Sequence, residues 1–166
     1  MYRYPFGQIH VRSVSTPAVG AALGALDAYC EYMESKVSQA TGGKAKESFT
    51  NAALAAQASA ALDREVLVLR RNFEEMFSHL EKGEKIPLPR RVRFRNDSAT
   101  AVDTATKIVQ QLFAACGARA AFSDHPVNRH FQDIHAIRLH HANGPDTPAA
   151  NFGGVLFGKK NTDFFI

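Results

Sequence analysis

The sequence lacks both a long apolar run and a secretory leader. The best candidate for a membrane span, residues 14–29, contains Asp27 and Pro17 among many Ala and Gly residues, so it falls short of the roughly 18 to 20 apolar residues that cross a bilayer. Residues 1–12 mix aromatic and polar side chains, whereas a secretory signal needs a basic start, an apolar run and a small-residue cleavage site. We therefore expect no membrane segment and a cytoplasmic location.

A strong excess of charge of one sign is also missing. The 166 residues include 20 Lys and Arg against 16 Asp and Glu, a formal net charge of +4. Nucleic-acid-binding domains concentrate basic residues far more than this, so we expect no nucleic-acid partner. There are only two cysteines, Cys30 and Cys116. They lie far apart in sequence within expected helices, which predicts reduced core residues rather than a disulfide.

Apolar and polar residues do not alternate with a period of two, so the sequence predicts no sheet. Gly and Pro instead cluster at a few places and leave long helix-forming stretches between them. These stretches predict four helices, at about residues 16–39, 46–82, 90–116 and 126–143. Thr16 is the expected N-cap of the first, with Pro17 at the first helical position. Gly20 and Gly24 share one face of it, which permits close approach of a neighbouring helix.

Each predicted helix carries apolar residues at helical spacing, and burying four such stripes favours an antiparallel up-and-down four-helix bundle within one domain. The stripe of the second helix comprises Phe49, Ala53, Ala56, Ala60, Val66 or Leu67, Leu69 or Arg70, Phe73, Phe77 and Leu80. A helix this long exceeds what a compact domain needs, which indicates contacts between copies of the chain. Residues 16–143 form the expected bundle. Residues 144–166, rich in Gly and Phe, are expected to be an irregular, loop-like tail that docks on an apolar surface.

Histidines are the first candidates for a chemical site, because five of the seven fall between residues 125 and 141. Metal-binding bundles use Glu-x-x-His pairs that place both ligands on one helix face, and no such pair is present. His130, His135 and His140 are spaced by five residues, which turns each about 140° from the last. We therefore expect no metal site.

Arg129, Asp133 and His140 form a more promising group. Arg129 and Asp133 are four residues apart and can pair on one helix face, and His140 follows Asp133 by seven residues, about 20° away around the helix axis. A histidine beside a carboxylate at the border of an apolar stripe can act as a proton shuttle in a cleft. The alternative is a surface ion pair with a histidine at the end of a helix, where the helix dipole favours it.

A second group lies at the turn before the last predicted helix. Gly117, Arg119 and Ser123 could bind a phosphate, because a guanidinium, a hydroxyl and the free N–H groups of a helix N-terminus all suit that anion. The alternative is an ordinary turn, in which Gly117 ends one helix and Ser123 caps the next.

These two groups lie in a stretch that resembles acyl-CoA dehydrogenase-type flavin-dependent monooxygenases, the oxygenases of two-component aromatic hydroxylases. The resemblance covers Gly117 to Asn143, where a Gly-small turn precedes Pro-x-x-Arg-aromatic-aromatic-Arg-Asp and a histidine seven residues later. The matching residues here are Gly117-Ala118-Arg119, His125-Pro126-Val127-Asn128-Arg129-His130-Phe131-Gln132-Asp133 and His140. Gln132 departs from the pattern, since an Arg is commoner there. The opening of the bundle, around Pro17 and Gly20, is more loosely similar.

The resemblance implies a function and a larger protein. Such enzymes join an N-terminal helical domain and a β domain to this bundle and form homotetramers. They use reduced FMN or FAD from a partner flavin reductase to hydroxylate an aromatic or related substrate with dioxygen. His140 matches the catalytic histidine, and Arg119 matches the residue that contacts the flavin phosphate, with Gly117 and Ser123 nearby. Arg129 and Asp133 match the Arg and Asp that anchor the final helix, and we expect Asp133 to act with His140 and Arg129 to belong to the flavin site. We expect this chain to be a C-terminal fragment of such a three-domain enzyme, inactive when isolated.

Two alternatives stay open. An acyl-CoA dehydrogenase domain would use a carboxylate to remove a proton from a thioester, but the late Glu followed by Gly-Thr of that group is absent. A helical module that only oligomerises would need no cofactor, and the long second helix is consistent with it.

Overall fold

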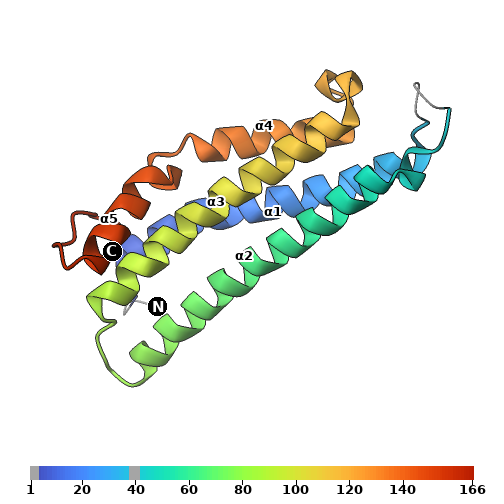
Figure 1. Ribbon diagram of the computed structural model, residues 1–166. Helices are drawn as coiled ribbons and strands as arrows, with labels where there is room; N and C mark the ends of the chain where they lie inside the picture. Colours follow the sequence, from blue (N-terminus) through green and yellow to red (C-terminus); the bar gives the residue numbers. More distant parts are fainter. Residues whose placement is uncertain (1–3, 38–41) are drawn as a thin grey trace.

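The computed structural model describes residues 4–37 and 42–166 of the chain, and its helices run side by side as an elongated bundle (Figure 1). The α-helices are α1 (Phe6–Ser35), α2 (Phe49–Glu81), α3 (Leu88–Cys116), α4 (Pro126–Arg138) and α5 (Asp146–Leu156). Short 3-10 turns occupy Ala45–Glu47, Ala118–Ala121 and His141–Asn143. The described residues form no strand beyond one isolated bridge between Val37 and Lys44. The predicted all-α up-and-down bundle is confirmed.

The core lies where α1 packs against α3 and α4. Small residues of α1, Ala18, Ala22 and Ala25, are fully buried and let the neighbouring helices approach closely. Bulkier side chains fill the space beside them; these include Tyr29, Leu62, Val102, Val109, Leu112, Val127 and Ile134. Each fully buried aliphatic side chain of this kind stabilises the fold by about 1.5–3 kcal/mol relative to exposure.

The first helix begins ten residues before its predicted start. Pro17 lies inside α1 rather than at its first position, so the expected N-cap at Thr16 is wrong. In the turns before Pro17, the hydroxyl of Ser13 donates to the carbonyl of His10, and that of Ser15 to the carbonyl of Arg12. Buried side chains before the proline, such as Val11, hold this segment in helical form. Tertiary packing therefore outweighs the local cost of an internal proline.

The face that α2 buries matches the stripe predicted from the sequence at Leu69 but not at the other predicted positions. Its buried residues are Ala58, Leu62, Leu69, Asn72 and Met76. Most of the predicted stripe is exposed, with exposed fractions of 87% for Phe49, 41% for Phe73 and 48% for Phe77. Helical spacing permits more than one apolar stripe on so long a helix, and only packing against α1 and α3 selects between them.

The region after α4 is more ordered than predicted. Residues 144–166 were expected to be irregular, but Asp146–Leu156 form α5, with acidic Asp146 in its first turn. The fourth helix also ends earlier than expected, at Arg138. Asn143 lies in the following 3-10 turn, where its side-chain amide donates to the carbonyls of Val14 and Ile137. Contacts with α1 and α3 thus order a segment whose Gly content indicated a loop.

The described residues include no helix that is both long and apolar enough to cross a bilayer. Both cysteines are free, and Cys116 is buried as expected. Cys30 is exposed, so its predicted place in the core is wrong.

Gly20 and Gly24 provide a test of the helix packing. A Cβ on Gly24 would lie 2.6 Å from the imidazole of His130, whereas a Cβ on Gly20 would have no neighbour within 4 Å. We expect Gly20→Ala to raise the free energy of unfolding by about 0.5–1 kcal/mol through helix propensity. Gly24→Ala should be less stable than Gly20→Ala by about 1–3 kcal/mol because of overpacking. Urea denaturation checks both, and equal stability of the two variants would contradict the packing of α1 against α4.

Candidate functional site

Apart from Arg129 and Asp133, which lie on α4 itself, the candidate residues lie in the segments that flank α4 at its two ends (Figure 1). Gly117, Arg119 and Ser123 lie in the connection that precedes α4, and His140 follows its C-terminus. The intervening helix has 13 residues, a length of about 20 Å at 1.5 Å per residue. Gly117, Arg119 and Ser123 are therefore separated in space from His140.

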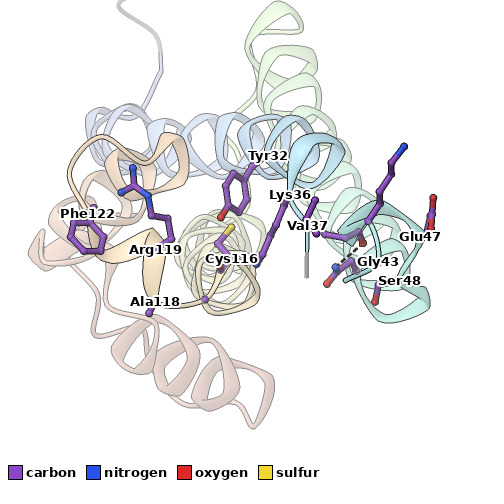
Figure 2. Close-up of a pocket in the computed structure, with 14 residues that line it drawn as sticks. Tyr32, Lys36, Val37, Gly43, Glu47, Ser48, Cys116, Ala118, Arg119 and Phe122 are labelled. Atoms are coloured by element: carbon purple, nitrogen blue, oxygen red, sulfur yellow. Dashed lines mark hydrogen bonds between the residues drawn. The ribbon is translucent and has the colours of Figure 1, made fainter. Parts of the chain in front are cut away.

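The first region borders a pocket of about 950 Å³ between the C-terminal ends of α1 and α3 and the start of α2. Gly117 and Arg119 both line it, and Ser123 is not among its lining residues. Figure 2 shows Tyr32, Lys36 and Cys116 together at the centre of this view, with Arg119 and Phe122 to one side. Two of the predicted cofactor residues thus share one cavity.

Lys36 lines the pocket and links the end of α1 to the end of α3. Its Nζ donates to the carbonyls of Ala115 and Cys116, at 3.3 and 2.9 Å, and lies 5.4 Å from the centre of the Tyr32 ring. These carbonyls end α3, where the helix dipole favours a cation. Burial raises the pKa of the Cys116 thiol to about 11. The thiol is therefore protonated at neutral pH and is a packing group rather than a nucleophile.

Arg119 already has an anionic partner. Its Nη1 and Nη2 donate to the two carboxylate oxygens of Asp124, at 2.8 and 2.5 Å, and its guanidinium lies 5.0 Å from the centre of the Phe122 ring. The hydrogen bonds that Arg119 donates to Asp124 raise the pKa of Arg119. Side-chain exposure is 50% for Arg119 and 67% for Asp124. Because exposed pairs contribute little free energy, an incoming anion can compete with Asp124 for the guanidinium.

The residue that caps α4 is His125, so the expected N-cap at Ser123 is wrong. The Nδ1 of His125 accepts from the backbone N–H of Val127 at 3.2 Å, and its ring packs edge-on against Tyr32. Burial lowers the pKa of His125, and the positive charge of Arg119 adds to this shift. The ring is therefore neutral at pH 7, with its remaining proton on Nε2.

Arg129 and Asp133 form the expected pair on α4, with 3.8 Å between Nε and Oδ2, and their side chains are 85% and 52% exposed. His140, however, lies beyond the helix, because α4 ends at Arg138 and His140 has extended backbone angles. The expectation that Asp133 and His140 share one side of a helix is therefore wrong. The helical periodicity used to relate them does not continue past Leu139.

His140 instead belongs to a histidine cluster with His10 and His141. The ring centres are 5.7 Å apart for His10 and His140 and 4.5 Å apart for His140 and His141. The ring of Phe165 stacks on His10 at 5.3 Å, and that of Phe6 stacks on His10 from the same helix at 5.8 Å. No sequence signal indicated His10, since it precedes His140 by 130 positions.

The backbone sets the proton position on His140. Its Nδ1 accepts from the N–H of Ala142 at 3.2 Å, so the neutral ring carries its proton on Nε2. Partial burial, followed by His141 and His10, lowers the pKa of His140. His140 is therefore a neutral hydrogen-bond donor at pH 7. Within residues 4–37 and 42–166, no three His, Cys, Asp or Glu side chains are arranged to hold a metal ion.

The chain has clear similarity to known proteins along its whole length. Residues 13–145 match the family model described as acyl-CoA dehydrogenase, C-terminal domain. A flavin-dependent monooxygenase, oxygenase subunit HsaA, from Rhodococcus jostii (strain RHA1) is 34% identical over 167 residues. That alignment covers 100% of this chain but 44% of the relative, so the chain spans less than half the relative's length.

Solved structures show the same relationship. The crystal structure of 3-HSA hydroxylase from Rhodococcus sp. RHA1 superposes with a TM-score of 0.90 at 34% identity, covering 99% of this chain and 42% of that one. XiaF from Streptomyces sp., solved in complex with FADH2 and glycerol, superposes with a TM-score of 0.88 at 17% identity, covering 95% of this chain and 40% of XiaF. At that identity the likeness to XiaF establishes the fold alone.

The neutral His125 makes stability depend on pH. Its folded-state pKa is below the ordinary value of 6.5, so the unfolded chain binds more protons as the pH falls below that value. We expect the free energy of unfolding to be constant above about pH 7 and to decrease from there towards pH 5. His125→Asn keeps an N-cap acceptor without a titrating ring and should reduce this loss. Urea midpoints at pH 7 and 5 check it, and an unchanged pH slope in His125→Asn would contradict the assignment.

Proposed function

The chain belongs to the family of acyl-CoA dehydrogenase C-terminal domains, and from this we propose that it is the helical C-terminal domain of a three-domain, reduced-flavin-dependent monooxygenase that hydroxylates an aromatic or related substrate with dioxygen. The observation that carries the proposal is the 34% identity to an oxygenase subunit along the entire chain. The neutral His140, set in an aromatic surface, supports it.

The pocket beside Arg119 supports binding of the flavin phosphate. Arg119 is half exposed and its pairing with Asp124 is solvent-accessible, so the guanidinium can exchange this carboxylate for a phosphate. Gly117 has a φ of 78° and an exposed backbone, which permits close approach of a ligand. Ser123 and Arg129 complete the proposed set from the connection and from the exposed side of α4. A partner reductase would supply the flavin in reduced form, either FMN or FAD, and the bound flavin would activate dioxygen.

His140 is the proposed catalytic residue. In its neutral state it can donate a hydrogen bond through Nε2 to a substrate oxygen, while its Nδ1 stays bonded to Ala142. Phe6 is 78% exposed and Phe164 is 88% exposed; with the histidine rings they form an aromatic surface that suits a planar ring. Asp133 is the second residue proposed for the catalytic site. It pairs with Arg129 on the exposed side of α4, and the family resemblance gives this pair the role of anchoring the helix that precedes His140.

The separation of the two regions favours an oligomer. Arg119 and His140 lie beyond opposite ends of α4, about 20 Å apart along the helix. Neighbouring copies in a homotetramer could combine one end of α4 with the other end from a second copy. The exposed apolar residues of α2, Phe49, Leu67, Phe73 and Phe77, provide a surface for such contacts.

The alternatives have less support. A dehydrogenase domain needs a carboxylate base at the site, but the histidine cluster contains none, and Asp133 is on the exposed side of α4. A module that only oligomerises explains the α2 surface. It does not explain why a histidine is held neutral beside aromatic rings with its proton in a defined position.

The α2 surface gives the first test. We expect the chain to be oligomeric at micromolar concentration, and Leu67→Lys with Phe77→Lys to reduce its mass in solution towards that of a monomer, because buried unpaired charges oppose association. Thr100→Lys, at an exposed position of α3, is the matched control. Light scattering after size exclusion measures the mass. A monomeric wild-type chain, or a mass insensitive to the α2 substitutions, would remove α2 as the interface.

The second test concerns catalysis. In a polypeptide of the relatives' full length that carries this chain, we expect His140→Ala to lower product formation by roughly 100-fold or more, as for a lost acid–base group. Flavin affinity should be unchanged. His79→Ala, near the end of α2, is the control and should retain activity. Hydroxylation at the wild-type rate by His140→Ala would exclude His140 from the mechanism.

A further inference from the structure

The last residues of the chain return to the beginning of α1. Figure 1 shows the C-terminus beside the start of that helix. Gln8 Nε2 donates to the carbonyl of Phe165 at 3.4 Å and to that of Arg91 at 3.1 Å. A Cβ on Gly7 would lie 2.8 Å from the carbonyl carbon of Phe165, so the glycine permits this contact between backbones. The C-terminal segment, residues 159–166, is thus docked on α1 in a defined position.

A buried ion pair holds this segment to α3. Arg95 Nε and Asp163 Oδ2 are 3.2 Å apart, and the two side chains are only 4% and 5% exposed. Neither of these two atoms has a hydrogen-bond partner among the described residues. The contact is therefore an ion pair whose geometry does not meet that of a hydrogen bond. The other carboxylate oxygen, Oδ1, accepts from the N–H of Phe165 at 2.8 Å. Asp163 therefore links α3 directly to the backbone of Phe165.

A second set of hydrogen bonds fixes the approach to Asp163. The Asn161 side chain accepts from the backbone N–H of Asp163 and donates to its carbonyl. Asn151, buried on α5, donates to Asn161 and accepts from the N–H and hydroxyl of Thr162. These hydrogen bonds connect residues 161–163 to α5 and so help to position the carboxylate of Asp163 beside Arg95.

Burying two charges is costly, and apolar residues of similar size often stabilise a fold as well or better. A buried pair is instead suited to selecting one arrangement among several similar ones. Here the selected feature is the position of Phe165, whose ring lies 5.3 Å from His10 and 5.4 Å from His141. Both histidines contact His140. A continuous set of contacts therefore leads from Arg95 to the proposed catalytic ring.

We propose that Arg95 and Asp163 are positioning residues for the histidine cluster: their buried pair holds Phe165 against His10 and His141 and so fixes the orientation of His140. The role in catalysis rests on the proposed monooxygenase function. The role in positioning the rings does not, and can be measured on the chain alone.

The test uses NMR of the chain with labelled histidine rings. Asp163→Asn should shift the ring signals of His10, His140 and His141, leave those of His79 and His125 in place, and speed amide exchange at Phe165 by about tenfold or more. Lys107→Met is the control, because it removes a 70% exposed lysine from its pair with Asp103 on the same helix, and it should shift none of these signals.

If Asp163→Asn fails to fold, the double variant Arg95→Met with Asp163→Leu decides, because it leaves no unpaired buried charge. It should keep the helical circular dichroism and still shift the three ring signals. Unchanged signals of His10, His140 and His141 in a folded variant of either kind would overturn the proposal.

In the full-length polypeptide, the double variant should lower kcat by about 10- to 100-fold, as for a misplaced catalytic group, and alter the pH profile while flavin affinity is retained. Ring signals that shift without any measurable hydroxylation in the wild type would sustain the positioning role and refute the monooxygenase. Ring signals that stay in place, with hydroxylation intact in the wild type, would refute the positioning role alone.

Discussion

The close packing of α1 against α3 and α4 is the constraint on which the other features depend. Ala18, Ala22 and Ala25 present almost no side-chain bulk and are fully buried, so the neighbouring backbones approach until larger residues fill the remaining space. The carbonyls that end α3 then come within reach of Lys36 on α1, and the ring of His125 within reach of Tyr32. At the other end, the same packing places His10 of α1 beside the residues that follow α4. Both candidate regions are therefore consequences of one helix interface.

The two regions differ in the charge of their polar side chains and in what surrounds them. Around the pocket, Arg119 and Asp124 are exposed to solvent, which weakens their pairing and leaves the guanidinium available to another anion. Around the histidine cluster, aromatic rings flank a partly exposed imidazole, and the pKa of His140 is lowered by partial burial and by its neighbouring histidines. A cationic, solvated region suits a phosphate, and an aromatic region with a neutral donor suits a planar substrate. This division agrees with the flavin chemistry proposed from the family.

The C-terminal segment completes the second region. Its hydrogen bonds through Asn151 and Asn161, and the buried Arg95–Asp163 contact, hold Phe165 in a place that apolar packing alone would leave less well defined. The buried pair costs desolvation free energy, and the role that we propose for it is to select this one position of Phe165. The segment should therefore be regarded as part of the site rather than as an extension of the fold.

The sequence by itself determined the helical class and the boundaries that have strong local signals. Gly117 ends α3 because its positive φ is available to glycine at little cost, and Pro126 starts α4 because the first turn needs no N–H from it. The i,i+4 pair of Arg129 and Asp133 is equally local. Tertiary structure alone decided the early start of α1, the buried face of α2, the helix α5 and the meeting of His10, His140 and Phe165. These depend on contacts between residues far apart in the chain, whose packing energy outweighs local propensity and leaves no periodic trace in the sequence.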